Sequence, residues 1–91
     1  MYLIALKLVL RWMLWKYSGN RKEIRKILRD EDMLAAVAQA CESYAATEKG
    51  YGSDTPFLDI LQFLMDNSDK ILEIIVFIIG LFAEMENTDV S

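Results

Sequence analysis

The sequence predicts an all-α protein, a small bundle of four or five helices in a single domain over residues 1–91. Its apolar fraction is 54%, and it contains only 1 Pro and 4 Gly. A chain of 91 residues folds as one domain whose core hides roughly 60–65% of the surface of the unfolded chain. Few helix breakers combined with long apolar stretches are typical of helices, and they argue against disordered and turn-rich β proteins.

The first helix is predicted over residues 2–17, where Leu, Ala and Lys favour a helix over a strand. Lys16 lies in its last turn, where a positive charge suits the negative end of the helix dipole. Ser18, Gly19 and Asn20 follow, and Gly19 is expected to take the left-handed conformation that commonly ends a helix.

Residues 21–49 carry the clearest helical pattern, because apolar residues recur there at steps of three and four. A break or bend is predicted near residue 30. Arg29 suits the end of a short helix, and Asp30 suits the start of the next one as its N-cap. A continuous helix in which Lys26 pairs with Asp30 stays open as the alternative. Gly50 is expected to end the segment.

Two more helices are predicted in the C-terminal part, over residues 56–66 and 69–86. Thr55 is the expected N-cap of the first, with Pro56 in its first helical position. Asn67 or Ser68 is expected to cap the second. Residues 71–79 are rich in β-branched side chains, so an α+β fold with a strand there stays open as an alternative.

The net charge of −4 divides the chain into two parts of opposite sign. Residues 1–29 hold eight bases and one acid, a net charge of +7, and residues 30–91 hold two bases and thirteen acids, a net charge of −11. This asymmetry indicates either an anionic partner for the basic part or pairing between the two parts. The residues expected to meet an anionic partner are Lys7, Arg11, Arg21, Lys22, Arg25, Lys26 and Arg29.

The residues that enzymes need are missing from the pattern, so no catalytic function, cofactor or metal is predicted. The chain has no His, the commonest general base and metal ligand. Its single Cys41 lies on an Ala-rich stripe without a nearby base, which is typical of a small buried residue. Asp59 and Asp66 are expected on a solvated strip of their helix. One free Cys and the lack of a secretory signal favour a cytoplasmic location.

Two further partner classes follow from the basic part of the chain. A membrane span is not expected, because Lys7 and Arg11 interrupt residues 2–17 and the apolar run 74–83 is too short. Docking of residues 1–29 on an anionic membrane surface is the second function hypothesis, although Lys16 lies on a different side of the helix from Arg11. Nucleic-acid binding by Arg21–Arg29 is the third.

The leading hypothesis is a non-enzymatic interaction or assembly protein, working as a homo-oligomer or with a permanent protein partner and without a small-molecule substrate. The chain carries more apolar side chains than one small core can cover, and monomers rarely expose large apolar patches. The two charged parts would then act as complementary ends of neighbouring subunits. Small size without catalytic groups also fits an accessory protein of a virus or mobile element. The predicted interface comprises Trp12, Trp15, Phe57, Phe63, Ile75, Phe77, Ile78, Leu81 and Phe82.

Overall fold

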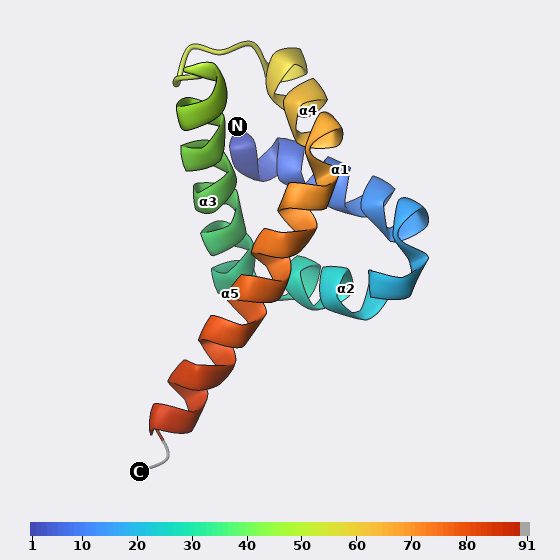
Figure 1. Cartoon of the computed structure of the whole chain (residues 1–91), viewed down its shortest axis with the longest axis vertical. Helices are drawn as coiled ribbons and strands as arrows, with labels where there is room; N and C mark the ends of the chain where they lie inside the picture. The colour runs from blue at the N-terminus through green and yellow to red at the C-terminus, as the bar shows by residue number, and fades with distance from the viewer. Residues whose placement is uncertain (90–91) are drawn as a thin grey trace.

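The computed structural model describes residues 1–89, which form a bundle of α-helices with one short 3-10 turn (Figure 1). In chain order the elements are α1 (Tyr2–Lys16), η1 (Ser18–Asn20), α2 (Arg21–Arg29), α3 (Glu31–Lys49), α4 (Phe57–Asp66) and α5 (Ser68–Asp89). The all-α prediction is therefore confirmed. The alternative with a strand over residues 71–79 is wrong, because this stretch lies inside α5 and buries Ile71 and Ile75, one helical turn apart.

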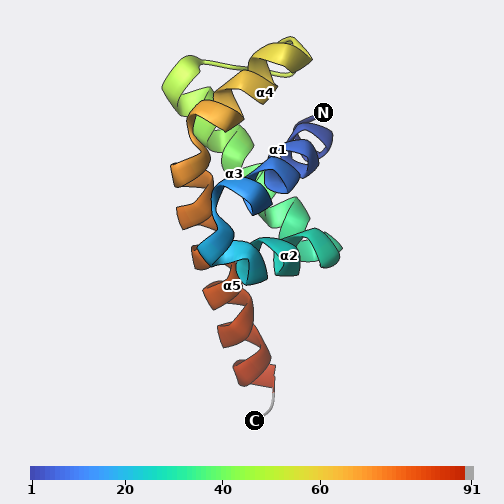
Figure 2. The same cartoon turned by 90° about the vertical axis from the view of Figure 1, so that its right-hand side faces the viewer.

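Helix α1 lies at the centre of the bundle and contacts α2, α3 and α4. It buries one stripe of side chains at steps of three and four: Tyr2, Ala5, Leu6, Val9, Leu10 and Met13. Helix α5 packs its N-terminal half against α3 and α2, and its C-terminal half extends beyond the body of the bundle (Figures 1 and 2). The described part of the chain is consequently elongated, measuring 45 × 27 × 19 Å.

The predicted break near residue 30 is confirmed, and its cause is the N-cap that Asp30 provides. Asp30 leaves the helical conformation with φ −111° and ψ 108°. Its Oδ1 accepts hydrogen bonds from the backbone N–H groups of Asp32 at 3.0 Å and Met33 at 3.1 Å. These bonds satisfy donors that have no partner inside α3, and the aspartate charge also suits the positive end of the α3 dipole.

The structure contradicts the glycine conformation predicted after the first helix and confirms the glycine that ends residues 21–49. Helix α1 ends at Lys16 and continues into η1, so Gly19 lies in a 3-10 turn and the prediction of a left-handed Gly19 is wrong. Gly50 does adopt the left-handed conformation, with φ 66° and ψ 24°, and its N–H bonds to the carbonyl oxygen of Ala46 at 2.9 Å. The C-terminal end of α3 is therefore confirmed.

The cap residues predicted for the two C-terminal helices make other hydrogen bonds. Thr55 Oγ1 accepts from the N–H of Gly52 at 2.9 Å and closes the loop, while Pro56 takes the cap position before Phe57. The Asn67 amide donates to the carbonyl of Phe63 at 2.8 Å. Ser68 is buried and its hydroxyl bonds to Tyr17 Oη at 2.8 Å. Buried hydroxyls such as those of Thr55 and Ser68 require partners. The Thr55 and Asn67 bonds are local, across three and four residues, whereas Ser68 bonds to a residue far away in the sequence.

We expect Asp30→Ala to lower the free energy of unfolding by about 0.5–2 kcal/mol, because it removes the acceptor of both capping bonds. Asp30→Asn is the matched control, since its amide oxygen still accepts the bonds, and it should remain closer to the natural protein. Urea unfolding followed by circular dichroism measures both. Equal stability of the Ala and Asn variants would show that the cap contributes little.

Candidate interaction surfaces

The predicted interface residues divide into three groups by burial. Trp15, Phe77 and Leu81 are exposed, Trp15 by 84% and Phe77 by 65%. Four others are half-buried against the core: Trp12, Phe57, Ile78 and Phe82. Phe63 and Ile75 are buried, so their assignment to an exposed interface is wrong. Phe63 packs between the rings of Tyr44 and Tyr51, each with its centroid at 5.7 Å, and Ile75 belongs to the buried stripe of α5.

One exposed surface lies on the outer side of α1 and is called the α1 face. Ile4, Leu8, Arg11 and Trp15 follow one another at steps of four, three and four residues, which places them along one line of the helix. Ile4 and Leu8 were not among the predicted interface residues, although this same spacing could have identified them. The α1 face comprises Met1, Leu3, Ile4, Lys7, Leu8, Arg11 and Trp15, all of them exposed.

Lys16 does not belong to the α1 face, because the fold turns it toward the other side of the helix. Its Nζ donates to Ser68 Oγ at 3.2 Å and lies 4.9 Å from the centre of the Trp12 ring and 5.3 Å from that of Tyr17. These contacts agree with the prediction that Lys16 lies on a different side of the helix from Arg11. Cation–π contacts and a hydrogen bond hold the Lys16 side chain on another side of α1, so Lys16 is not part of the α1 face.

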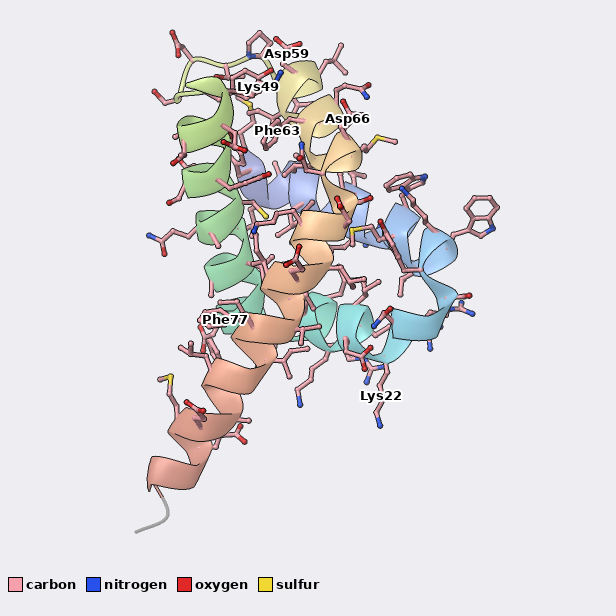
Figure 3. All side chains as sticks on the ribbon, in the orientation of Figure 1. Lys22, Lys49, Asp59, Phe63, Asp66 and Phe77 are labelled. Carbon is pink, nitrogen blue, oxygen red and sulfur yellow. The ribbon has the colours of Figure 1, made fainter. Side chains whose placement is uncertain are left out.

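The second exposed surface lies on α5 and is called the α5 face. It comprises Asp69, Glu73, Val76, Phe77, Gly80, Leu81, Glu84 and Met85. Figure 3 shows Phe77 near the middle of α5, on the side away from α2. Five members of this face, Val76, Phe77, Gly80, Leu81 and Glu84, line a shallow hollow of about 210 Å³. A side chain added at Gly80 would meet no other atom within 4 Å, so the hollow is open to a partner.

The seven residues predicted to meet an anionic partner are all exposed. Four of them, Lys22, Arg25, Lys26 and Arg29, share a hollow of about 900 Å³ with Asp30, Glu31 and Asp32 at the corner between α2 and α3. Lys22 points away from the body of the protein in Figure 3. This hollow brings four bases and three acids together at the start of α3.

Helix α3, which follows the basic helix α2, lacks the side chains that recognise DNA bases. Helix α3 comes directly after α2, as the second helix of a helix-turn-helix would, and it exposes Gln39 and Glu42. Proteins that recognise a sequence in the major groove use basic side chains such as Arg, or several amide side chains, at these positions. The exposed charges of α2 are thus suited to general electrostatic attraction only.

The titratable groups with altered pKa values are unsuited to acid–base or nucleophilic chemistry. Burial raises the pKa of the Cys41 thiol to about 12, so Cys41 is a small buried side chain as expected. Burial, and then the charge of Glu42, raises the pKa of Tyr2. Tyr2 Oη is buried with no hydrogen-bond partner among the described residues. Both shifts move away from neutral pH, opposite to those that catalytic groups need.

Asp59 and Asp66 lie along a hollow of about 390 Å³ between α4 and the end of α3, together with Lys49 (Figure 3). Asp66 accepts a hydrogen bond from Gln62 Nε2 at 2.8 Å, and both carboxylates are exposed. In the part of the chain that is described, no three His, Cys, Asp or Glu side chains gather closely enough to hold a metal ion. This hollow is a solvated polar surface, as the sequence predicts for the two aspartates.

Comparison with known proteins gives no relatives: no family model, no curated protein and no solved structure matches this chain. Among the described helices, none has the length and apolar character that crossing a bilayer requires. The α1 and α5 faces are therefore the features from which a function can be argued.

We expect Cys41 to react very slowly with a thiol reagent in the folded protein, because its pKa of about 12 keeps it protonated at neutral pH and burial blocks access. The absorbance of a released aromatic thiolate at pH 8 measures the rate. Reaction in urea provides the control, where the exposed thiol should react at the rate of an ordinary cysteine. A folded-state rate equal to that in urea would contradict the burial of Cys41.

Proposed function

We propose that this protein is a non-enzymatic interaction module that self-associates through its exposed apolar helix faces. One observation carries the proposal: ten large apolar side chains remain exposed among the side chains that are described. Nine of the ten belong to the α1 and α5 faces, and Leu58 on α4 is the tenth. Apolar residues gathered along helix faces, rather than scattered singly, are typical of protein interaction sites.

The extension of α5 supports the same proposal. Helix α5 spans 22 residues, and its C-terminal half passes beyond the bundle (Figure 2). A helical segment of a few turns is marginally stable in water unless it packs one face against another element. Leu81 and Met85 expose apolar surface along this extension, and Phe77 does so just before it. A second protein surface covering them would stabilise the helix and remove that surface from water.

The energies favour association only if several of these side chains are buried together. Full burial of one large apolar side chain contributes about 1.5–3 kcal/mol, whereas forming a complex costs roughly 4–15 kcal/mol in lost freedom of motion. Trp15 and Phe77, the most exposed aromatic residues, are the side chains expected to contribute most. A contact that used only one of the ten residues would therefore be too weak to persist.

The proposal is tested by the mass of the protein in solution at micromolar concentration, measured by light scattering without detergent. We expect the natural chain to form oligomers, and the double variant Phe77→Gln with Leu81→Gln to remain monomeric with unchanged helix content. Leu58→Gln is the matched control, because Leu58 is 74% exposed but lies outside both faces. A natural chain that stays monomeric would refute self-association.

Docking on an anionic membrane surface is the second candidate, and the position of Lys16 is the observation that favours it. With Lys16 held against Ser68, the α1 face presents Lys7, Arg11 and Trp15 together and exposes no acid. Basic residues and tryptophan on one helix face are typical of helices that lie in the headgroup region.

Flotation with vesicles containing phosphatidylserine tests the second candidate. We expect the natural chain to float with these vesicles and Lys7→Glu with Arg11→Glu to stay behind. Vesicles of phosphatidylcholine alone are the control for charge. Failure of the natural chain to float at low salt would remove this candidate.

A further inference from the structure

We infer that the surface hollow between the end of α1 and the start of α2 binds a phosphate monoester group. The hollow measures about 500 Å³ and is lined by Arg11, Leu14, Trp15, Ser18 and Arg21. This inference goes beyond the proposed self-association, because a hollow formed by one copy binds a ligand without a second copy.

The fold brings two arginines to this hollow from different helices. Arg11 lies in the C-terminal half of α1, and Arg21 is the first residue of α2. Between them the chain turns back through the 3-10 turn η1, so that α1 and α2 contact each other (Figure 1). Two of the seven bases predicted to meet an anionic partner therefore line one hollow.

The charge along this hollow has a single sign. Among the described residues, those that line it include two arginines and no Asp or Glu. The nearest acid along the chain, Glu23, is half-buried and accepts a hydrogen bond from Asn20 Nδ2 at 3.2 Å. The hollow at the corner between α2 and α3 is different, because three acids share it with the four bases and would repel an anion. The hollow between α1 and α2 is consequently the better anion site.

The hydrogen-bond donors along the hollow suit a phosphate group. An arginine guanidinium stays charged and presents its N–H donors in a planar fork that matches two phosphate oxygens. The hydroxyl of the exposed Ser18 can donate a further hydrogen bond. A phosphate monoester carries a charge of about −1.5 to −2 at pH 7, which two arginines compensate. A diester carries one negative charge and leaves part of this positive charge uncompensated.

Trp15 and Leu14 provide apolar surface beside the two arginines. Trp15 is 84% exposed, more than any other large apolar side chain that is described, and Leu14 is half-buried. The volume of about 500 Å³ exceeds that of a phosphate group and falls within the range of about 300–1,000 Å³ of small-molecule sites. The organic part of a phosphate ester can therefore pack against the indole while the phosphate binds the arginines.

Glycerol 3-phosphate is the probe for an ester that reaches the hollow from solution, with binding followed by NMR at constant ionic strength. We expect saturable shifts of the Trp15 indole N–H and of backbone amides around the hollow. The variant Arg11→Gln with Arg21→Gln should raise the dissociation constant by about tenfold or more. The matched control is Arg25→Gln with Arg29→Gln, which removes the same charge outside the hollow and should change binding by less than about twofold.

Two further measurements separate the geometry of the site from its charge. Arg11→Lys with Arg21→Lys keeps both charges but removes the planar forks, so binding should weaken severalfold. Glycerol without phosphate should cause no saturable shift. Circular dichroism checks that every variant keeps its helix content.

Vesicles test whether the same group reaches the hollow from a membrane. Phosphatidic acid presents a phosphate monoester at the bilayer surface, whereas phosphatidylserine presents a diester. At matched surface potential we expect stronger flotation with vesicles of phosphatidylcholine and phosphatidic acid. Loss of that preference in Arg11→Gln with Arg21→Gln, and its retention in Arg25→Gln with Arg29→Gln, would identify a lipid headgroup as the ligand of this hollow.

Three results would overturn the inference. They are the lack of both saturable glycerol 3-phosphate binding and a preference for phosphatidic acid, equal loss of binding in the two arginine-to-glutamine variants, and shifts that lie away from the hollow. Ultracentrifugation of the same samples keeps the proposed function separate. A monomer that binds the ester supports the inference and refutes self-association, whereas an oligomer that binds neither ester nor phosphatidic acid refutes the inference alone.

Discussion

The structure depends on how α1 divides its surface between the core and the solvent. Its buried stripe packs against three other helices, so the bundle forms around this one helix. A helix enclosed on one side leaves its opposite side exposed, and in α1 that side still carries Ile4, Leu8 and Trp15. Part of the apolar surface of the sequence therefore stays exposed because only one side of α1 enters the core. One stripe of α1 enters the core together with residues of the other helices, and the opposite stripe stays exposed.

The contact of Lys16 and Tyr17 with the buried Ser68 connects the end of α1 to the start of α5. Ser68 is the first residue of α5, so these bonds hold the two helix ends together. From that point α5 packs against α3 and α2 and continues beyond the bundle (Figure 1). Opposite charges still meet within one copy at the corner between α2 and α3, where four bases share a hollow with Asp30, Glu31 and Asp32.

Three polar side chains stabilise the fold through hydrogen bonds. Asp30 caps α3, Thr55 closes a loop, and Ser68 joins two helices. Cys41, the strongest nucleophile in the chain, is protonated and enclosed. Exposed charged and apolar side chains lie together along the α1 and α5 faces.

Periodicity, helix caps and charge by themselves determined the helices, the break at Asp30 and the separation into a basic and an acidic part, because these depend on neighbours within one or two turns. They also indicated an excess of apolar surface. Tertiary structure decided which apolar residues are exposed: Phe63 and Ile75 entered the core, while Ile4 and Leu8 stayed outside. Helices apolar around most of their circumference have several possible buried sides, and only packing against the other helices selects one. The same packing decided that Lys16, still exposed, and Tyr17 bond to the hydroxyl of the buried Ser68.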